Sequence, residues 1–197
     1  RNEGLMRCLR FGAGCFYFIM SIVPSKYLRF AQFAGFKADR PLGLQYIRQV
    51  QESGKLRMPF ATVMLLFNCL LVPRGLADVT LLIAEANRVI AATLAKYPEG
   101  TAWHVMASQS SRKQLDLAAS REHARVALES ARALGREPTF LAYEYGTVHA
   151  MMLQWAEAAS LLERLLLQPG FRVRGTCALQ IARSEERRVG KECRSRW

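Results

Sequence analysis

The hydrophobic pattern of the chain changes about a third of the way along its length. Two long apolar runs come first: residues 11–23 carry no charge over thirteen positions, and Met58–Val72 lies between Arg57 and Arg74. A helix that crosses a bilayer needs about 20 apolar residues. Both runs therefore predict helices buried in a protein core, with residence at a membrane surface as the alternative.

Proline, glycine and one aspartate divide this first part into helices. Residues 5–10 are the expected end of a helix that precedes the first run. Pro24 stops that run and begins a helix over residues 25–34, which Gly35 ends. Asp39 has the side chain of a helix N-cap, and the helix that it begins is predicted to continue to Glu52.

A long amphipathic helix is predicted over Asp78–Lys96, because apolar positions recur there at helical spacing. The sequence Tyr97-Pro98-Glu99-Gly100 is a strong turn signal that ends it. Thr101 is expected to cap the next helix, to which Trp103 and Met106 supply bulk. Amphipathic helices therefore follow the two apolar runs.

An internal repeat with an offset of 38 residues begins near residue 108, and segment 115–124 aligns with segment 153–162. Small residues recur twelve positions apart, one on each helix of a hairpin, which lets two antiparallel helices approach closely. Trp155 is expected to fill the space where the second helix of the later hairpin begins. Chance similarity in a helical chain rich in Ala and Leu is the alternative. The matched positions are Ser108 with Gly146, Ser120 with Ala158, and Ala124 with Leu162.

Two such hairpins in series are typical of tetratricopeptide repeats, whose basic period is 34 residues. The extra length is expected in the loop 134–139, and residues 171–182 are the expected first helix of a third pair after Pro169-Gly170. We therefore predict an all-α chain, a fragment of a helical-hairpin (tetratricopeptide-like) α-solenoid. Its parts are an apolar, basic helical segment over residues 1–75 and tetratricopeptide-like helix pairs over residues 76–182.

The last fifteen residues are set apart from the fold. Arg183–Trp197 resembles the translation of a sequencing adapter joined to a truncated transcript, so we expect an artefactual or disordered tail there. A genuine charged tail is the alternative. Because the chain begins with Arg1 rather than methionine, we also expect it to be a piece of a longer protein.

Positive charge accompanies the most apolar part of the chain. The formal net charge is +12. Residues 1–74 hold eleven basic residues against three acidic ones, whereas residues 75–182 hold eleven against ten. This distribution suits an anionic membrane surface or an acidic protein partner, and a solvated basic face is the alternative. Nucleic acid binding is not expected, because no aromatic–basic interleaving accompanies the charge.

The sequence offers no reactive or metal-binding motif, so no catalytic residue, cofactor or metal is expected. The cysteines lack CxxC spacing and are expected to be reduced, mostly buried thiols of an intracellular protein. A zinc site built from Cys8, Cys15 and a histidine is the alternative. The cysteines ahead of the tail are Cys8, Cys15, Cys69 and Cys177, and the histidines are His104, His123 and His149.

Three further features have a structural and a functional interpretation. The histidines stand outside any HExxH motif and are expected to be structural. Gly12-x-Gly14 lacks the rest of a phosphate-binding loop, so the two glycines are expected to allow close helix packing. Glu144 is expected on an exposed helix face, or as a side chain that lines a peptide groove.

Short motifs in a fixed order carry a family resemblance. Over most of residues 3–182 the chain resembles the tetratricopeptide-repeat protein 39 family, which includes fungal inclusion-body clearance proteins. Ser108 and Ser120 depart from the glycine or alanine that is usual in such repeats. The motifs are Gly12-x-Gly14-x-Phe16, Ser21-x-x-Pro24, Gly35-Phe36-x-x-Asp39-Arg40 and Gly43-Leu44, then Tyr97-Pro98-x-Gly100-Thr101, Tyr143-Glu144-x-Gly146, Trp155-x-x-Ala158 and Cys177-Ala178-Leu179-Gln180.

The resemblance implies a helical-repeat adaptor, and it supplies no catalytic residues. In fungal members it implies association with the mitochondrial outer membrane, lipid droplets and clearance of misfolded protein; in animal members it implies roles in lipid metabolism. We accordingly expect a cytoplasmic, non-enzymatic scaffold for protein–protein interaction in protein quality control or lipid homeostasis, located at the mitochondrial outer membrane or lipid droplets. No small-molecule substrate is expected. The alternative is a membrane-surface protein whose residues 11–74 contact lipid.

Overall fold

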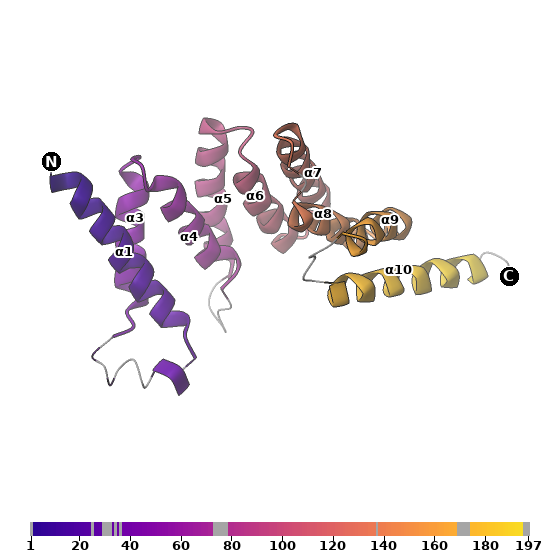
Figure 1. Ribbon diagram of the computed structural model, residues 1–197, viewed down its shortest axis with the longest axis horizontal. Coiled ribbons are helices and arrows are strands. Elements are labelled where there is room, and N and C mark those ends of the chain that lie inside the picture. Colours follow the sequence, from indigo (N-terminus) through magenta and orange to yellow (C-terminus); the bar gives the residue numbers. More distant parts are fainter. Residues whose placement is uncertain are drawn as a thin grey trace. The chain divides into compact units, whose positions relative to one another are not determined.

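The computed structural model describes residues 2–24, 26–28, 33, 35, 37–72, 79–136, 138–168 and 174–194, and no strand occurs among them (Figure 1). The predicted all-α class is confirmed. The chain divides into two compact units, Arg1–Val89 and Ile90–Trp197. The division lies within helix α5 (Val79–Lys96). The predicted boundary between residues 75 and 76 lies outside the described residues and stays a prediction.

The first unit contains α1 (Asn2–Ile22), α3 (Arg40–Glu52) and α4 (Met58–Leu70), with α3 packed against both of the others. Its core joins Phe18 of α1, Ile47 and Val50 of α3, and Leu65 of α4. The prediction that the second apolar run forms a core helix is confirmed, because eight of the thirteen residues of α4 are buried.

The same prediction for the first apolar run was wrong for most of the helix. Helix α1 is one continuous helix from Asn2, and within residues 11–23 only Gly14 and Phe18 are buried. The reason is that α1 packs against α3 along one face only. The opposite side exposes large apolar side chains, which we call the α1 apolar face: Leu5, Leu9, Phe16 and Ile19.

Two glycines permit the close crossing of α1 and α3. A Cβ atom added to Gly43 would lie 2.8 Å from the backbone nitrogen of Phe18 and 2.9 Å from the carbonyl oxygen of Gly14. A Cβ on Gly14 would lie 3.0 Å from the carbonyl oxygen of Gly43. Gly12 differs from our expectation: it is exposed, and nothing among the described residues lies within 4 Å of its Cβ position.

The start of α3 shows why the residues from Asp39 to Leu44 belong together. The Asp39 carboxylate accepts a hydrogen bond from the backbone of Leu42 at 2.9 Å and caps the helix as predicted. The Arg40 guanidinium donates to Asn68 of α4 at 2.9 and 3.2 Å. Gly43 then makes the crossing, and Leu44 enters the core. The first turn of α3 therefore includes its N-cap, its hydrogen bonds to α4 and its close contact with α1.

Several predictions fall wholly or partly outside the described residues. They concern Phe36, the cap at Asp78, the stops at Pro73 and Pro169-Gly170, and most of the helix over residues 25–34. Within that helix, the backbone amides of Tyr27 and Leu28 donate to the Pro24 carbonyl. Gly35 has a φ of 84°, a conformation that favours glycine.

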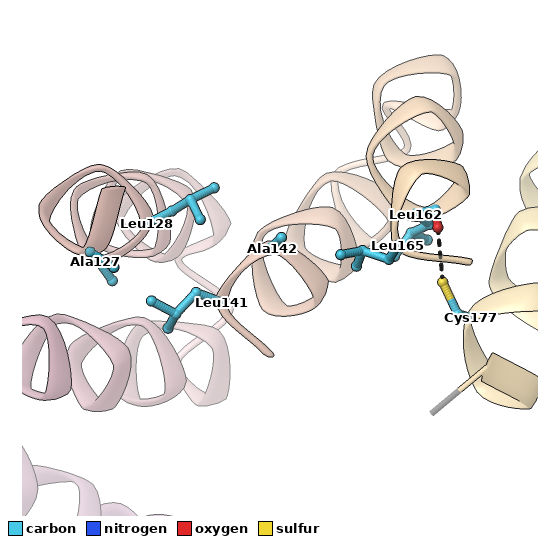
Figure 2. Packing of buried hydrophobic residues seen from close by; sticks show 8 residues of the cluster. Ala127, Leu128, Leu141, Ala142, Leu162, Leu165 and Cys177 are labelled. Atoms are coloured by element: carbon cyan, nitrogen blue, oxygen red, sulfur yellow. Dashed lines mark hydrogen bonds between the residues drawn. The ribbon is translucent and has the colours of Figure 1, made fainter. Parts of the chain in front are cut away.

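The second unit carries the predicted helix pairs. They are α6 (Thr101–Lys113) with α7 (Leu117–Ala133), and α8 (Thr139–Met151) with α9 (Trp155–Leu166), followed by α10 (Arg174–Arg194). Figure 2 shows the core, in which Leu128 of α7, Leu141 of α8, Leu162 of α9 and Cys177 of α10 contribute to one cluster. The Cys177 thiol donates to the Leu162 carbonyl at 3.3 Å (Figure 2).

Most helix boundaries in this unit lie where the sequence predicted that a helix would end or begin. Gly135, with φ at 67°, ends α7, and the Arg136 amide bonds back to the Ala131 carbonyl as in a Schellman motif. Thr101 is not the cap that we predicted: Gly100 takes the N-cap position. A Cβ on Gly100 would lie 2.3 Å from the Trp103 ring, so the indole occupies that space. Helix α10 continues to Arg194, through most of segment 183–197.

Candidate protein-binding surface

The two helix pairs turn in the same way, at positions 38 residues apart. Leu115 and Leu153, which follow α6 and α8, both have φ at 63°. The Asp116 amide donates to the Ser111 carbonyl, and the Gln154 amide donates to the His149 carbonyl, both at 3.0 Å. Leucine rarely adopts a positive φ, so sequence reasoning gave no signal for this turn. The shared conformation supports a true repeat.

Small residues lie where the helices of each pair meet. The hydroxyl groups of Ser108 and Ser120 are 3.0 Å apart, and the Ser120 hydroxyl also lies 3.0 Å from the Ser108 carbonyl oxygen. In the second pair a Cβ on Gly146 would lie 3.0 Å from the Leu162 side chain, and Ala158 is fully buried. Serine therefore adds hydrogen bonds in the first pair where glycine gives close contact in the second.

The remaining predicted packing residues occupy different positions. Ala124 is buried in α7, and Leu162 is buried in α9 at the matching position of the repeat. Trp155 begins α9 and is only partly buried. That its ring fills the space where the second helix of the later hairpin begins stays a prediction.

The first helices of successive pairs are joined by polar side chains. Arg112 of α6 donates to the Glu144 carboxylate of α8 at 3.0 Å, and Gln109 donates to the same oxygen at 2.6 Å. The Arg112 and Glu144 side chains keep 18% and 15% of their surface exposed. Our two alternatives for Glu144 were an exposed carboxylate and a groove-lining one. The Glu144 carboxylate is not the exposed one: it is mostly covered and accepts hydrogen bonds from two donors.

The same face continues from α8 to α10. The Gln180 amide donates to the Tyr143 hydroxyl at 3.3 Å, and Gln180 contacts the Thr147 hydroxyl at 3.4 Å. Position 109 on α6 corresponds to position 147 on α8 in the repeat, so consecutive first helices present equivalent positions. We call this surface the polar ladder: Gln109, Arg112, Tyr143, Glu144, Thr147 and Gln180.

A cavity of about 310 Å³ lies at one end of the polar ladder. Thr147, Met151 and Trp155 line it from α8 and α9. Gln180 and Arg183 line it from α10. Arg183 is the first residue of the segment that resembles an adapter, so only the α8 and α9 walls of the cavity are assigned to the candidate surface. Partly exposed Trp155 and Met151 give this cavity apolar surface beside the polar ladder.

The histidines act within the packing of the repeats. The Nδ1 atoms of His104 and His123 are 3.0 Å apart, and His104 Nε2 lies 2.8 Å from the Pro98 carbonyl oxygen. That carbonyl can only accept, so His104 carries its proton on Nε2 and its Nδ1 accepts from His123. Burial lowers the pKa of His123, and repulsion from His104 when that ring is protonated acts in the same direction. Burial also lowers the pKa of His149, whose ring lies edge-on to Tyr145.

The described residues hold no group of three His, Cys, Asp or Glu side chains arranged to bind a metal ion. Cys69 and Cys177 are buried free thiols as expected, but Cys8 is exposed and Cys15 is half-buried. Burial raises the pKa of the Cys177 thiol, which keeps it protonated and unreactive.

Comparison with known proteins agrees with this architecture. The family model for Iml2/Tetratricopeptide repeat protein 39 matches residues 2–168, which include the first unit and both helix pairs. No solved structure matches the chain significantly. Helical-repeat proteins of this kind present their helices as scaffolds for protein interaction. The chain belongs to the Iml2/Tetratricopeptide repeat protein 39 family.

Proposed function

We propose that the polar ladder is the surface by which this helical-repeat protein binds its protein partners, as a non-enzymatic adaptor. The observation that carries the proposal is the repetition of half-buried polar side chains along α6, α8 and α10. An extended peptide segment leaves backbone amides and carbonyls unpaired, and such side chains can pair with them. The Met151 and Trp155 cavity would take one apolar side chain of that segment.

A charge-neutral double substitution tests this proposal. Arg112→Ala with Glu144→Ala removes the ladder ion pair without changing net charge. The matched control is Arg125→Ala with Glu129→Ala, which removes an exposed ion pair from α7. Affinity purification of the full chain should recover fewer specific partners with the ladder variant and the wild-type set with the control. Equal recovery from both variants, or a substrate turned over by the purified chain, would contradict the proposal.

A photo-crosslinking amino acid locates the contact directly. Placed at Thr147, it should form covalent products with the partner proteins. Placed at Glu163, which is exposed on α9, it should form few. Products of equal yield from the two positions would show that the partner does not lie on the polar ladder.

We propose a second, compatible function: the first unit rests on a membrane surface through the α1 apolar face. Residues Glu3–Ile22 form a helix long and apolar enough to cross a membrane by length and composition, with 11% of its apolar window buried. Core helices and signal sequences meet the same criterion. The exposure of Leu9 (57%) and Ile19 (49%) favours lipid contact over a core position, and the basic charge of residues 1–74 favours an anionic surface.

Liposome flotation tests this second function. Phe16→Ser with Ile19→Ser should reduce recovery with anionic vesicles, because two exposed apolar side chains leave the interface. The control is Val79→Ser with Leu81→Ser, two exposed apolar residues of α5. A wild-type chain that stays in the soluble fraction with both anionic and neutral vesicles would end this proposal.

The resemblance to the family motivates a finer proposal about cellular role. We propose a role in protein quality control or lipid homeostasis, at the cytoplasmic face of the mitochondrial outer membrane or at lipid droplets. Fluorescence imaging of the tagged chain beside markers of both organelles is the measurement. A uniformly cytosolic signal that is unchanged by Phe16→Ser with Ile19→Ser would count against it.

A further inference from the structure

We propose that the first unit binds an anionic lipid in a cavity between the start of α1 and the turn that joins α3 to α4. One acyl chain would occupy the cavity, and its phosphate would rest on Lys55 and Arg57. This inference deepens the membrane-surface proposal, and its biological setting rests on that proposal. The ligand chemistry rests on the cavity itself.

The cavity has a volume of about 390 Å³ and an apolar interior. Its walls include Gly4 and Cys8 on α1 and Val50 on α3. Gly4 has nothing within 4 Å of its Cβ position among the described residues, so the wall is open at that point. Val50 is buried in the core of the unit and forms the floor.

Three cationic side chains, Arg7, Lys55 and Arg57, border this apolar space. Glu3 engages Arg7 at 2.9 Å, whereas Lys55 and Arg57 form no ion pair among the described residues. Glu52 is the other carboxylate on the adjoining turn, and it too forms no ion pair there. Two cations therefore remain available to an external anion.

The adjoining helix end adds to this positive potential. Arg57 is the N-cap of α4, no side chain caps that helix, and its first turn contains no acidic residue. The partial positive charge at a helix N-terminus favours a nearby anion. It acts in the same direction as Lys55 and Arg57.

An acyl chain suits the cavity better than an acidic peptide does. A peptide would bring backbone amides and carbonyls into an apolar space, and each would need a hydrogen-bond partner. Ser53 is the polar uncharged side chain of the lining, and its hydroxyl already donates to the Val50 carbonyl at 2.6 Å. An acyl chain needs no partners, and its single charged end matches the cationic rim.

The exposed leucines beside the cavity are consistent with a lipid that enters the cavity from a membrane. Leu56 is 85% exposed between Lys55 and Arg57, and it lines the cavity itself. Leu5 and Leu9 on α1 each follow a lining residue directly and are mostly exposed. A bilayer surface would cover these side chains while one of its lipids entered the cavity.

Isothermal titration of the full chain with oleoyl lysophosphatidic acid, kept below its micelle concentration, tests the cavity without a membrane. Lys55→Gln with Arg57→Gln should weaken binding about 25-fold, because each cation near an anionic lipid contributes about fivefold. Gly4→Phe should weaken it about fourfold for each methylene group that it displaces. Gly4→Ala leaves room for the chain and should bind within about twofold of wild type.

Controls separate the cavity from general electrostatics. Arg88→Gln with Lys96→Gln makes the same charge change on α5 and should leave binding unchanged. Wild-type affinity in Gly4→Phe, an equal loss in the α5 variant, or equally tight binding of inorganic phosphate would each overturn the proposal. Flotation with anionic vesicles but no lysophosphatidic acid binding would overturn the cavity while leaving the membrane-surface proposal standing.

Discussion

Glycine-to-alanine substitutions near the crossing of α1 and α3 are predicted to raise or lower stability, depending on which glycine is replaced. Gly43→Ala places a methyl group 2.8 and 2.9 Å from backbone atoms of α1, which cannot move without shifting the helix. Overpacking of this kind costs about 1–3 kcal/mol. Replacing a glycine inside a helix by alanine also stabilises the helix by up to about 1 kcal/mol, which offsets part of that cost. The upper half of the overpacking range applies to a backbone clash, so we expect a net loss of about 1–2 kcal/mol.

Two substitutions in α1 serve as internal references. Gly14→Ala meets the Gly43 carbonyl and the Ile47 side chain at 3.0 Å, a milder conflict that should leave a net loss of about 0–1 kcal/mol. The methyl group of Gly12→Ala would have no described atom within 4 Å, so this substitution should stabilise the helix by up to about 1 kcal/mol. The predicted order of stability is therefore Gly12→Ala, wild type, Gly14→Ala, Gly43→Ala.

Hydrogen exchange measured by mass spectrometry is the suitable assay, because the chain has two units and global unfolding need not be two-state. Protection of peptides from α1 and α3 should rise for Gly12→Ala and fall for Gly43→Ala, while peptides from α8 and α9 stay unchanged. Equal shifts in Gly12→Ala and Gly43→Ala would refute the reasoning, because helix propensity alone would then explain both.

Three further predictions concern the second unit. Ser120→Ala removes the hydrogen bonds to Ser108 inside the first pair and should lower the opening free energy of α6 and α7 amides by about 0.5–1.5 kcal/mol in hydrogen exchange; unchanged protection of those peptides would contradict it. The pKa of folded His123 lies below its ordinary 6.5, so the unfolded state binds more protons. Melting temperature should therefore fall as pH drops from 7.5 through 6.5, with a smaller fall in His123→Gln, and a pH-independent melt would rule this out. Arg112→Ala leaves a largely covered Glu144 carboxylate and should destabilise more than Arg112→Ala with Glu144→Ala, which a double-mutant cycle measures.

Local signals in the sequence predicted most helix boundaries because those signals act over a few residues. Asp39 caps α3, Gly135 ends α7, and the loop before Thr139 lies where proline and glycine indicated. Thr101 misled us because glycine at position 100 also leaves room for the Trp103 ring. A cap that competes with a packing contact cannot be recognised from residue types alone.

The candidate binding surface could be predicted only in outline. The 38-residue offset indicated which positions correspond, but not that Gln109, Arg112 and Glu144 join across two helices. Those pairs depend on how one hairpin lies on the next, and helix spacing along the chain does not encode that. The cationic cavity in the first unit likewise joins α1 to a turn about fifty residues later.

The sequence alone determined that this chain is helical, that it repeats, and to which family it is similar, because periodicity, capping residues and small-residue spacing are properties of the linear chain. The tertiary structure decided which apolar surfaces are buried. Helix α4 is enclosed, while α1, equally apolar over residues 11–23, buries one face against α3 and exposes the other. Hydrophobicity indicates that removing a surface from water lowers the free energy. Only the packing of neighbouring elements determines whether another part of the same chain covers that surface.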